Sequence, residues 1–94
     1  MEMYFEWDDE KSESNFCKHG VRFEEAIWVF DDPLSISVQD RIVSGEYRWQ
    51  TIGMAGGMLL MVAHTSRGEE GTEVIRIISA RYAEPKERRR YEHG

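Results

Sequence analysis

The second half of the chain is a series of strand-like segments joined by turns that permit only tight reversals. The segments are Ile36–Val38, Tyr47–Ile52, Met58–Thr65 and Thr72–Ala80. The glycine-containing links between them are Ser44–Gly45, Ala55–Gly57 and Gly68–Gly71. A parallel crossover needs a dozen or more residues, so these neighbours should pair antiparallel. The third segment is apolar on both faces and should be the central strand.

The first third predicts a strand followed by two helices. Residues 3–7 alternate as in a strand. Asp8 or Asp9 can cap a helix by accepting its unpaired N–H groups, and Gly20 suits the left-handed end of that helix. Apolar residues over 23–30 then share one helical face.

Two prolines mark further helix boundaries. Pro33 ends the second helix because it disfavours a helical Asp32, and Pro85 begins a last short helix over residues 86–91. The order is β-α-α-β-β-β-β-α, in one domain over residues 1–94. We expect an α+β fold with an antiparallel sheet of four to five strands and helices packed on one face.

Charge is distributed unevenly along the chain. The net charge is −6, but residues 1–32 hold ten acidic and three basic residues, whereas residues 76–94 hold three acidic and six basic ones. A diffuse nucleic-acid-binding coat, which would be basic throughout, is excluded. A local phosphate-binding cluster near the C-terminus remains open, as do an acidic face that docks a basic partner and a merely solvated surface.

Cysteine content and apolar runs indicate a cytoplasmic protein. Cys17 is the one cysteine, so no intrachain disulfide can form, and its place in a helix beside Phe16 predicts a partly buried, inert thiol. The opening residues lack a signal-peptide pattern. The apolar run 58–63 is far shorter than the ~20 residues of a membrane span, so no membrane association is expected.

His64 is a candidate proton carrier. It ends the predicted central strand on the same side as Leu60 and Val62, and histidine titrates near neutral pH. The alternative is a structural histidine that is hydrogen-bonded at the sheet edge. His19, His64 and His93 are far apart, and no pair has zinc-ligand spacing, so we expect no metal and no other cofactor.

Four arginines lie on or beside predicted strands: Arg48, Arg67, Arg76 and Arg81. Several on one face would form a phosphate clamp, whereas a lone arginine on a strand commonly pairs with a solvated carboxylate. The alternation along the last strand places Ser79 and Arg81 on one side and Arg76 on the other.

The C-terminal run 86–91 is mostly basic and carries the strongest local signal of a functional segment. Glu87 and Tyr91 are one helical turn apart, and Arg88 and Arg89 lie between them. The run predicts a phosphate-binding helix beside the sheet, and the alternative is a solvated helix with i,i+4 pairs.

These motifs together resemble the BrnT toxin family. The matching segments, in order, are Phe5–Asp8, Asn15–Val21 (an N-x-x-K-H-G-V pattern), Phe23–Ala26, Val29–Leu34, Arg48–Trp49, Thr51–Gly53, His64–Arg67, Ile75–Arg81 and Glu87–Tyr91. Many members carry a histidine a few residues before the arginine–aromatic pair, where this chain has Ile42. If that histidine transfers a proton, this chain must use another group.

The resemblance implies a ribonuclease toxin of a type II toxin–antitoxin pair with a RelE-like fold. It implies a BrnA-type antitoxin as the partner, RNA as the substrate, inhibition of translation and growth, and promoter DNA bound only through the antitoxin complex. The partner should cover the basic surface, and an exposed strand edge is a second candidate for contact.

RNA can be cleaved without a metal because its own 2′-OH is a nucleophile. We expect Arg81 and Arg48 to clamp the phosphate, with Arg88 next. His64 or Glu87 would carry the proton, and Tyr91 would act as an orienting group or an acid. Additional phosphate contacts would come from the basic residues Arg67, Arg76, Arg88 and Arg89. The rival hypothesis is a non-catalytic phosphate-, nucleic-acid- or protein-binding module that acts as a corepressor with a DNA-binding partner.

Overall fold

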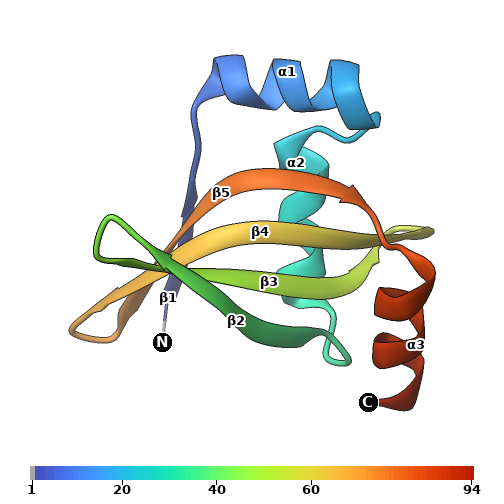
Figure 1. Cartoon of the computed structure of the whole chain (residues 1–94). Coiled ribbons are helices and arrows are strands. Elements are labelled where there is room, and N and C mark those ends of the chain that lie inside the picture. Colours follow the sequence, from blue (N-terminus) through green and yellow to red (C-terminus); the bar gives the residue numbers. More distant parts are fainter. Residues whose placement is uncertain (1) are drawn as a thin grey trace.

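A computed structural model describes residues 2–94 as three helices, a 3-10 segment and five strands (Figure 1). In chain order the elements are β1 (Glu2–Glu6), α1 (Asp9–His19), α2 (Phe23–Ala26), the 3-10 helix η1 (Ile27–Asp31), β2 (Ile36–Val43), β3 (Glu46–Ala55), β4 (Met58–Glu69), β5 (Thr72–Tyr82) and α3 (Pro85–His93). Within residues 2–94, no helix is long and apolar enough to cross a membrane.

The five strands form one mixed sheet in the order β1-β5-β4-β3-β2. β4 is central, as predicted, and β2 to β5 pair antiparallel through short turns. β1 pairs parallel with β5, so the α+β class is confirmed but the expectation of a purely antiparallel sheet is wrong. The length of a connecting turn fixes the relative direction of consecutive strands only. β1 and β5 are separated by most of the chain, so no turn length predicts whether they pair parallel or antiparallel. β4 also continues through Gly68, so its turn is shorter than predicted.

The boundaries of α1 follow from local chemistry. The Asp8 side chain accepts hydrogen bonds from two backbone N–H groups of the first turn, at 2.8 and 3.3 Å, which selects it over Asp9 as the cap. Gly20 ends the helix at φ +76°, in the left-handed region that glycine adopts most readily. Cys17 is exposed, so the expected partial burial is wrong.

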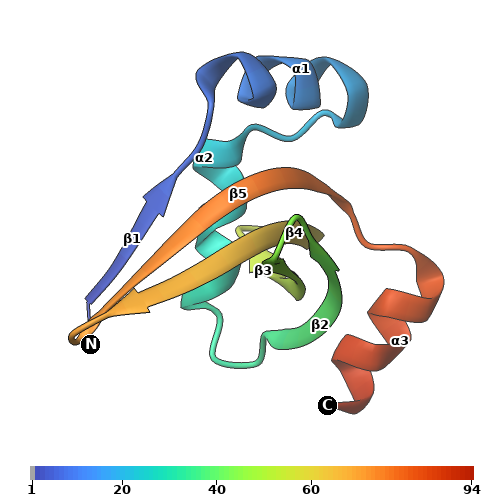
Figure 2. The ribbon, with the colours of Figure 1, turned by 60° about the vertical axis from the view of Figure 1, so that its left-hand side comes forward.

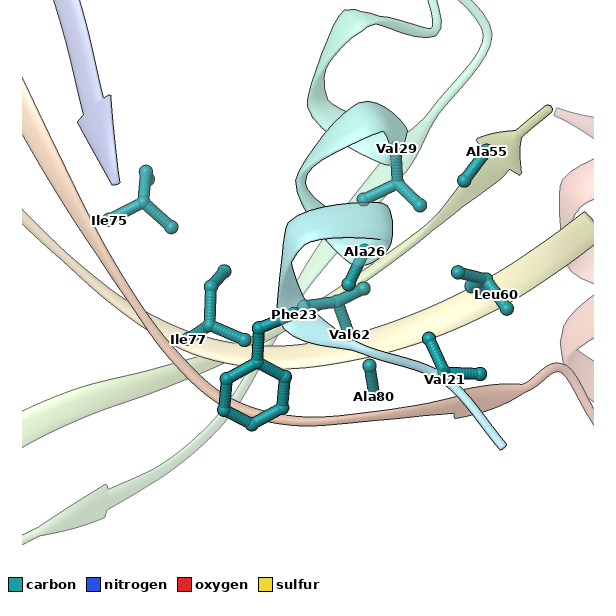
Figure 3. Close-up of a cluster of buried hydrophobic side chains, with 10 residues drawn as sticks. All are labelled: Val21, Phe23, Ala26, Val29, Ala55, Leu60, Val62, Ile75, Ile77 and Ala80. Carbon is teal, nitrogen blue, oxygen red and sulfur yellow. The ribbon is translucent and has the colours of Figure 1, made fainter. Parts of the chain in front are cut away.

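The main core lies between the sheet and the segment formed by α2 and η1 (Figure 3). The predicted helix over residues 23–30 is α-helical for one turn and continues as a 3-10 helix, and the chain becomes extended at Asp32, before Pro33. Three of its side chains, Phe23, Ala26 and Val29, and Val21 just before it are buried against the sheet. The sheet residues of this cluster are Ala55, Leu60, Val62, Ile75, Ile77 and Ala80. We call this side of the sheet the α2 face.

α3 lies against the opposite side of the sheet, which we call the α3 face (Figure 2). Tyr91 of α3 packs there against a smaller cluster of Ile52, Leu59 and Met61. The expectation that all helices pack on one face is therefore wrong. Periodicity shows which side of a helix is buried, but not which side of a sheet it is buried against.

α1 completes the sheet where β1 ends. β1 pairs only with residues 72–76 of β5, so the outer edge of the second half of β5 has no strand beside it. There the Asn15 amide donates to the Ala80 carbonyl at 2.9 Å and accepts from the Ala80 N–H at 3.1 Å, as a neighbouring strand would. The second amide proton of Asn15 is donated to the Val21 carbonyl at 2.8 Å. Both amide protons and the amide oxygen of this buried side chain therefore have hydrogen-bond partners.

A bulge in β5 reverses the alternation of that strand. Ala63 pairs with Ser79 and His64 pairs with Ile77, so Ile78 is an extra residue on β5. Arg76 and Arg81 therefore share the α3 face. The prediction that they lie on opposite sides is wrong, because two-residue alternation assumes an unbroken ladder.

Replacing Asn15 tests how strongly α1 is attached to the sheet. Asn15→Ala leaves three buried backbone groups without partners, and we expect it to lower the free energy of unfolding by about 2 to 3 kcal/mol in urea titrations. Ser14→Ala, an exposed neighbour on the same helix, should change it by less than about 0.5 kcal/mol. Equal stability of the two variants would contradict this role.

Candidate functional site

A polar cavity of about 200 Å³ lies between α3 and the α3 face of the sheet. β3 contributes one residue, β5 one and α3 three: Gln50, Arg81, Lys86, Glu87 and Arg90. Helical spacing explains the α3 set, because 86, 87 and 90 project from the side of the helix that meets the sheet. Residues distant in sequence thus form one concave, charged site.

Arg81 and Glu87 make a bidentate ion pair at the centre of this cavity. Arg81 Nη1 donates to Glu87 Oε1 and Nη2 donates to Oε2, both at 2.8 Å. The Glu84 N–H donates to Oε1 as well, at 2.8 Å. Burial raises the pKa of Glu87, but the hydrogen bonds from Arg81 and the Glu84 backbone outweigh it, so the net pKa is lowered. Hydrogen bonding to Glu87 raises the pKa of Arg81, so both groups are charged at neutral pH.

The cavity carries a net positive charge. Arg81, Lys86 and Arg90 supply three formal positive charges against the carboxylate of Glu87 in the cavity lining. Glu84 Oε1, 3.7 Å from Arg81 Nη2, adds a second carboxylate beside the cavity, which leaves +1. Gln50 adds an uncharged amide that can donate or accept a hydrogen bond. This donor set in a concave site is suited to a phosphodiester anion.

Tyr91 fixes the far end of α3 rather than lining the cavity. Its hydroxyl donates to Asp32 Oδ2 at 2.6 Å, and the same oxygen accepts from the Met54 N–H at 2.8 Å. The bond from Tyr91 lowers the pKa of Asp32, and the bond to Asp32 raises the pKa of Tyr91. The tyrosine therefore stays protonated and ties the helix to β3 and the segment before β2.

His64 lies on the α2 face, across the sheet from Arg81. Its ring is 4% exposed and packs edge-on against Phe30, with ring centroids 4.8 Å apart. The predicted side of the strand is confirmed, but the structure does not bring His64 to the Arg81 cavity. Burial lowers the pKa of His64, which keeps the imidazole neutral at neutral pH.

Both ring nitrogens of His64 are engaged in hydrogen bonds. Nδ1 lies 3.2 Å from the Thr65 carbonyl, which can only accept, so Nδ1 carries the proton in the neutral ring. Nε2 then accepts from the Thr51 hydroxyl at 2.7 Å, and Ser37 donates to Thr51 at 2.8 Å. These bonds match the predicted alternative of a structural, hydrogen-bonded histidine, but His64 lies inside β4, the central strand, and not at the strand end or sheet edge as predicted.

The remaining strand arginines lie farther along the α3 face. Arg48 and Arg76 both pair with Thr65, one from each side, and so lie in one row across three strands. Arg81 pairs with Met61, four residues along β4, which places its row about 13 Å away. Arg48 and Arg81 therefore share a face but do not form one clamp. The Nε atom of Arg48 is buried without a hydrogen-bond partner in the described part of the chain.

Arg67 is exposed and engaged on the same face, where its Nη1 donates to Glu6 at 2.7 Å. On α3, Arg88 and Arg89 are exposed and do not line the cavity. The cavity is lined instead by Lys86 and Arg90, where the sequence predicted Arg88 and Arg89. Once Glu87 is recognised as the buried position of this helix, Arg90 follows at i+3, and Lys86 lies one turn before Arg90.

Two further features bear on the predicted chemistry. Within residues 2–94, no group of three or more His, Cys, Asp or Glu side chains could hold a metal ion. Ile42, the position at which the sequence departs from the resembled pattern, is 57% exposed on the edge strand β2.

Comparison with protein-family models identifies the chain. Residues 7–87 match the model described as the ribonuclease toxin, BrnT, of type II toxin–antitoxin system. The chain belongs to the BrnT family. The matched range includes every cavity residue except Arg90. No curated protein matched the chain.

Membership in the BrnT family gives the activity in general terms and confirms the resemblance of the sequence motifs. The chain is a ribonuclease toxin of a type II toxin–antitoxin system, and the family implies an antitoxin partner.

The ion pair at the centre of the cavity predicts a pH dependence of stability. A carboxyl group whose pKa is lower in the folded chain stabilises the fold above its unfolded value, 4.5 for Glu87. That contribution is lost as the pH falls through the folded pKa. We therefore expect the destabilisation caused by Glu87→Gln in urea titrations to be largest near pH 7 and to shrink below about pH 4.

Glu92→Gln is the matched control, since Glu92 is exposed on the same helix. Its unfolding curve should follow that of the unmodified chain from pH 7 to pH 3. A Glu87→Gln effect that is constant with pH would contradict the assignment of an ionised, hydrogen-bonded Glu87.

Proposed function

We propose that the chain cleaves RNA without a metal cofactor, in the cavity between α3 and β5. The observation that carries this proposal is the meeting of Arg81, Lys86 and Arg90 around the carboxylate of Glu87. These three cations outnumber the carboxylates of Glu84 and Glu87, which favours a phosphodiester, and Glu87 provides a proton acceptor within the same site. Family membership supports the ribonuclease activity, and this geometry supports its location.

The cations act on charge that develops in the transition state. The 2′-oxygen forms a bond to phosphorus while the bond from phosphorus to the 5′-oxygen breaks, and negative charge grows on the phosphoryl oxygens. The guanidinium of Arg81 is fixed by its bidentate bonds, so little reorganisation is needed when that charge appears. Each fixed donor of this kind contributes about 3 kcal/mol, or ~100-fold in rate.

Glu87 is the proton acceptor that the geometry favours over His64. Oε1 accepts two hydrogen bonds, whereas Oε2 accepts one in the described structure and can take the 2′-OH proton. His64 lies on the other face with both ring nitrogens engaged. The 5′-oxygen takes its proton from Lys86, since a guanidinium stays protonated. The products are a 2′,3′-cyclic phosphate and a 5′-hydroxyl end.

Arg48 and Arg76 supply a second phosphate contact. They lie in one row on the α3 face, across β3, β4 and β5. The row is about 13 Å from that of Arg81, too far for the same phosphate but suitable for another part of one RNA strand. In this arrangement the RNA crosses the α3 face from α3 toward Arg76.

We also propose the biological setting from family membership. The antitoxin is of the BrnA type, the fold is RelE-like, and the toxin acts in the cytoplasm by inhibiting translation and growth. Promoter DNA is bound only through the antitoxin complex, because a chain with a net charge of −6 is unsuited to binding DNA alone.

Two arginines on one helix provide a matched test of the active site. Arg90→Ala removes a cavity cation and should lower the rate of RNA cleavage by about 10- to 100-fold. Arg89→Ala removes the same charge from the exposed side of α3 and should retain the rate within about threefold. Cleavage of a defined RNA by the purified chain, with melting of each variant checked, measures both.

Product analysis separates cleavage from binding alone. A 2′,3′-cyclic phosphate end on the RNA supports the proposed reaction. Retardation of RNA that remains intact would favour the non-catalytic binding module and overturn the proposal. Equal loss of activity in both arginine variants would place the chemistry elsewhere.

A structural role for His64 predicts a different pattern. His64→Gln can keep a hydrogen bond to Thr51 and should retain the cleavage rate within about threefold when compared below its melting temperature. A loss of ~100-fold in a folded His64→Gln variant would assign the proton transfer to His64 instead.

A further inference from the structure

The sheet has two outer strands, β1 and β2, and they differ in how their edges are protected. The ladder of β2 is interrupted between Gln39 and Ile42, where the charged residues Asp40 and Arg41 lie. Bulges and charges of this kind block pairing with another chain. β1 has five regularly paired residues with no bulge and no proline, and its two charged residues, Glu2 and Glu6, are both acidic. Its outer edge is therefore a template for a further strand.

The backbone of β1 presents free hydrogen-bonding groups on that edge. The Glu2 N–H donates inward, to the Gly71 carbonyl at 2.9 Å. In a parallel ladder the direction alternates along the strand, so Met3 and Phe5 direct their N–H and C=O groups away from β5. Figure 2 shows β1 at the margin of the sheet with no described element on its outer side.

An apolar groove runs beside this edge on the α2 face. A cavity of about 290 Å³ lies between β1 and η1, lined by Met3, Phe5, Ile27, Trp28, Phe30 and Asp31. A second cavity of about 290 Å³ shares Met3 and Phe30 with the first. Trp28 is 58% exposed and Met3 is 43% exposed, and both line the same groove. A strand added to β1 would direct every second side chain into this groove.

The other face of β1 carries acidic groups. Glu2 and Glu6 project there on either side of Tyr4, where Glu2 accepts from the Tyr4 hydroxyl and Glu6 from Arg67, and residues 1–32 as a whole have a net charge of −7. The remaining side chains of an added strand would lie beside these carboxylates. Opposite charges on paired strands stabilise the pair.

We infer that the antitoxin binds the β1 edge as an extended strand whose side chains alternate between apolar and basic. The apolar ones fill the groove beside Trp28, and the basic ones face Glu2 and Glu6. Main-chain hydrogen bonds supply affinity, and the groove supplies specificity. The inference rests on the proposed toxin–antitoxin function for its partner, but not on the residues proposed for cleavage.

Titration of the purified chain with the antitoxin encoded beside it tests this surface. Met3→Pro removes an outward N–H without touching the ladder to β5, and Trp28→Ala empties the groove. Each should raise the Kd for the antitoxin at least about 10-fold. Tyr47→Ala removes a side chain of similar exposure (52%) on β3 and should change the Kd by less than about twofold.

Hydrogen exchange provides a second measurement that does not depend on a variant. Antitoxin binding should slow exchange of the Met3 and Phe5 amides at least about 10-fold. Unchanged exchange at both amides, or wild-type affinity in both folded variants, would overturn the inference. The free Trp28→Ala chain should cleave RNA as the unmodified chain does, so a failed nuclease proposal and a failed docking surface give different results.

Discussion

The bulge at Ile78 determines which face of the sheet carries the cations. Before it, Ile75 and Ile77 point into the core under η1, and after it Ala80 does the same. The intervening extra residue leaves Arg76 and Arg81 on the opposite face. Without it, one half of β5 would direct arginine side chains into the apolar core, at a cost that no partner there could offset. The core and the proposed active site therefore both depend on one interruption of the ladder.

The Arg81–Glu87 pair links this strand to the last helix. Arginine supplies a rigid pair of donors and Glu87 a buried carboxylate, so the pair fixes where α3 lies as well as the charge state of the cavity. Tyr91 secures the same helix one turn later through Asp32. The helix is short and strongly polar, and these side-chain bonds supplement the small apolar contact that it makes with the sheet.

The sequence was most informative where structure is decided locally. Asp8 and Gly20 define α1, Pro85 begins α3, and the apolar run of β4 identifies the central strand. Partners set by distant residues could not be predicted in this way. The parallel neighbour of β1, the face chosen by α3 and the bulge at Ile78 all depend on packing between segments far apart in the chain.

The residues of the candidate site also differ in whether local sequence patterns could predict them. Arg81 and Glu87 were predicted and lie together, and family motifs pointed to them. Lys86 and Arg90 were missed because a run of five charged residues has no obvious inner side until Glu87 is known to be buried. His64 shows the converse limit, since the strand pattern gave its side correctly but could not show that Arg81 occupies the other one.

The hydrogen bonds of the Asn15 amide have a consequence for how the molecule opens locally. This amide takes the place of a neighbouring strand at Ala80 of β5, so α1 is held there by a single side chain and, through Ser12, by a hydrogen bond from the Phe23 N–H, rather than by a continuous ladder. When α1 detaches through thermal fluctuation, Ala80 and its neighbours become a bare, apolar strand margin while the rest of the fold persists. Displacement of one helix would therefore give this sheet a third edge at which another chain can pair.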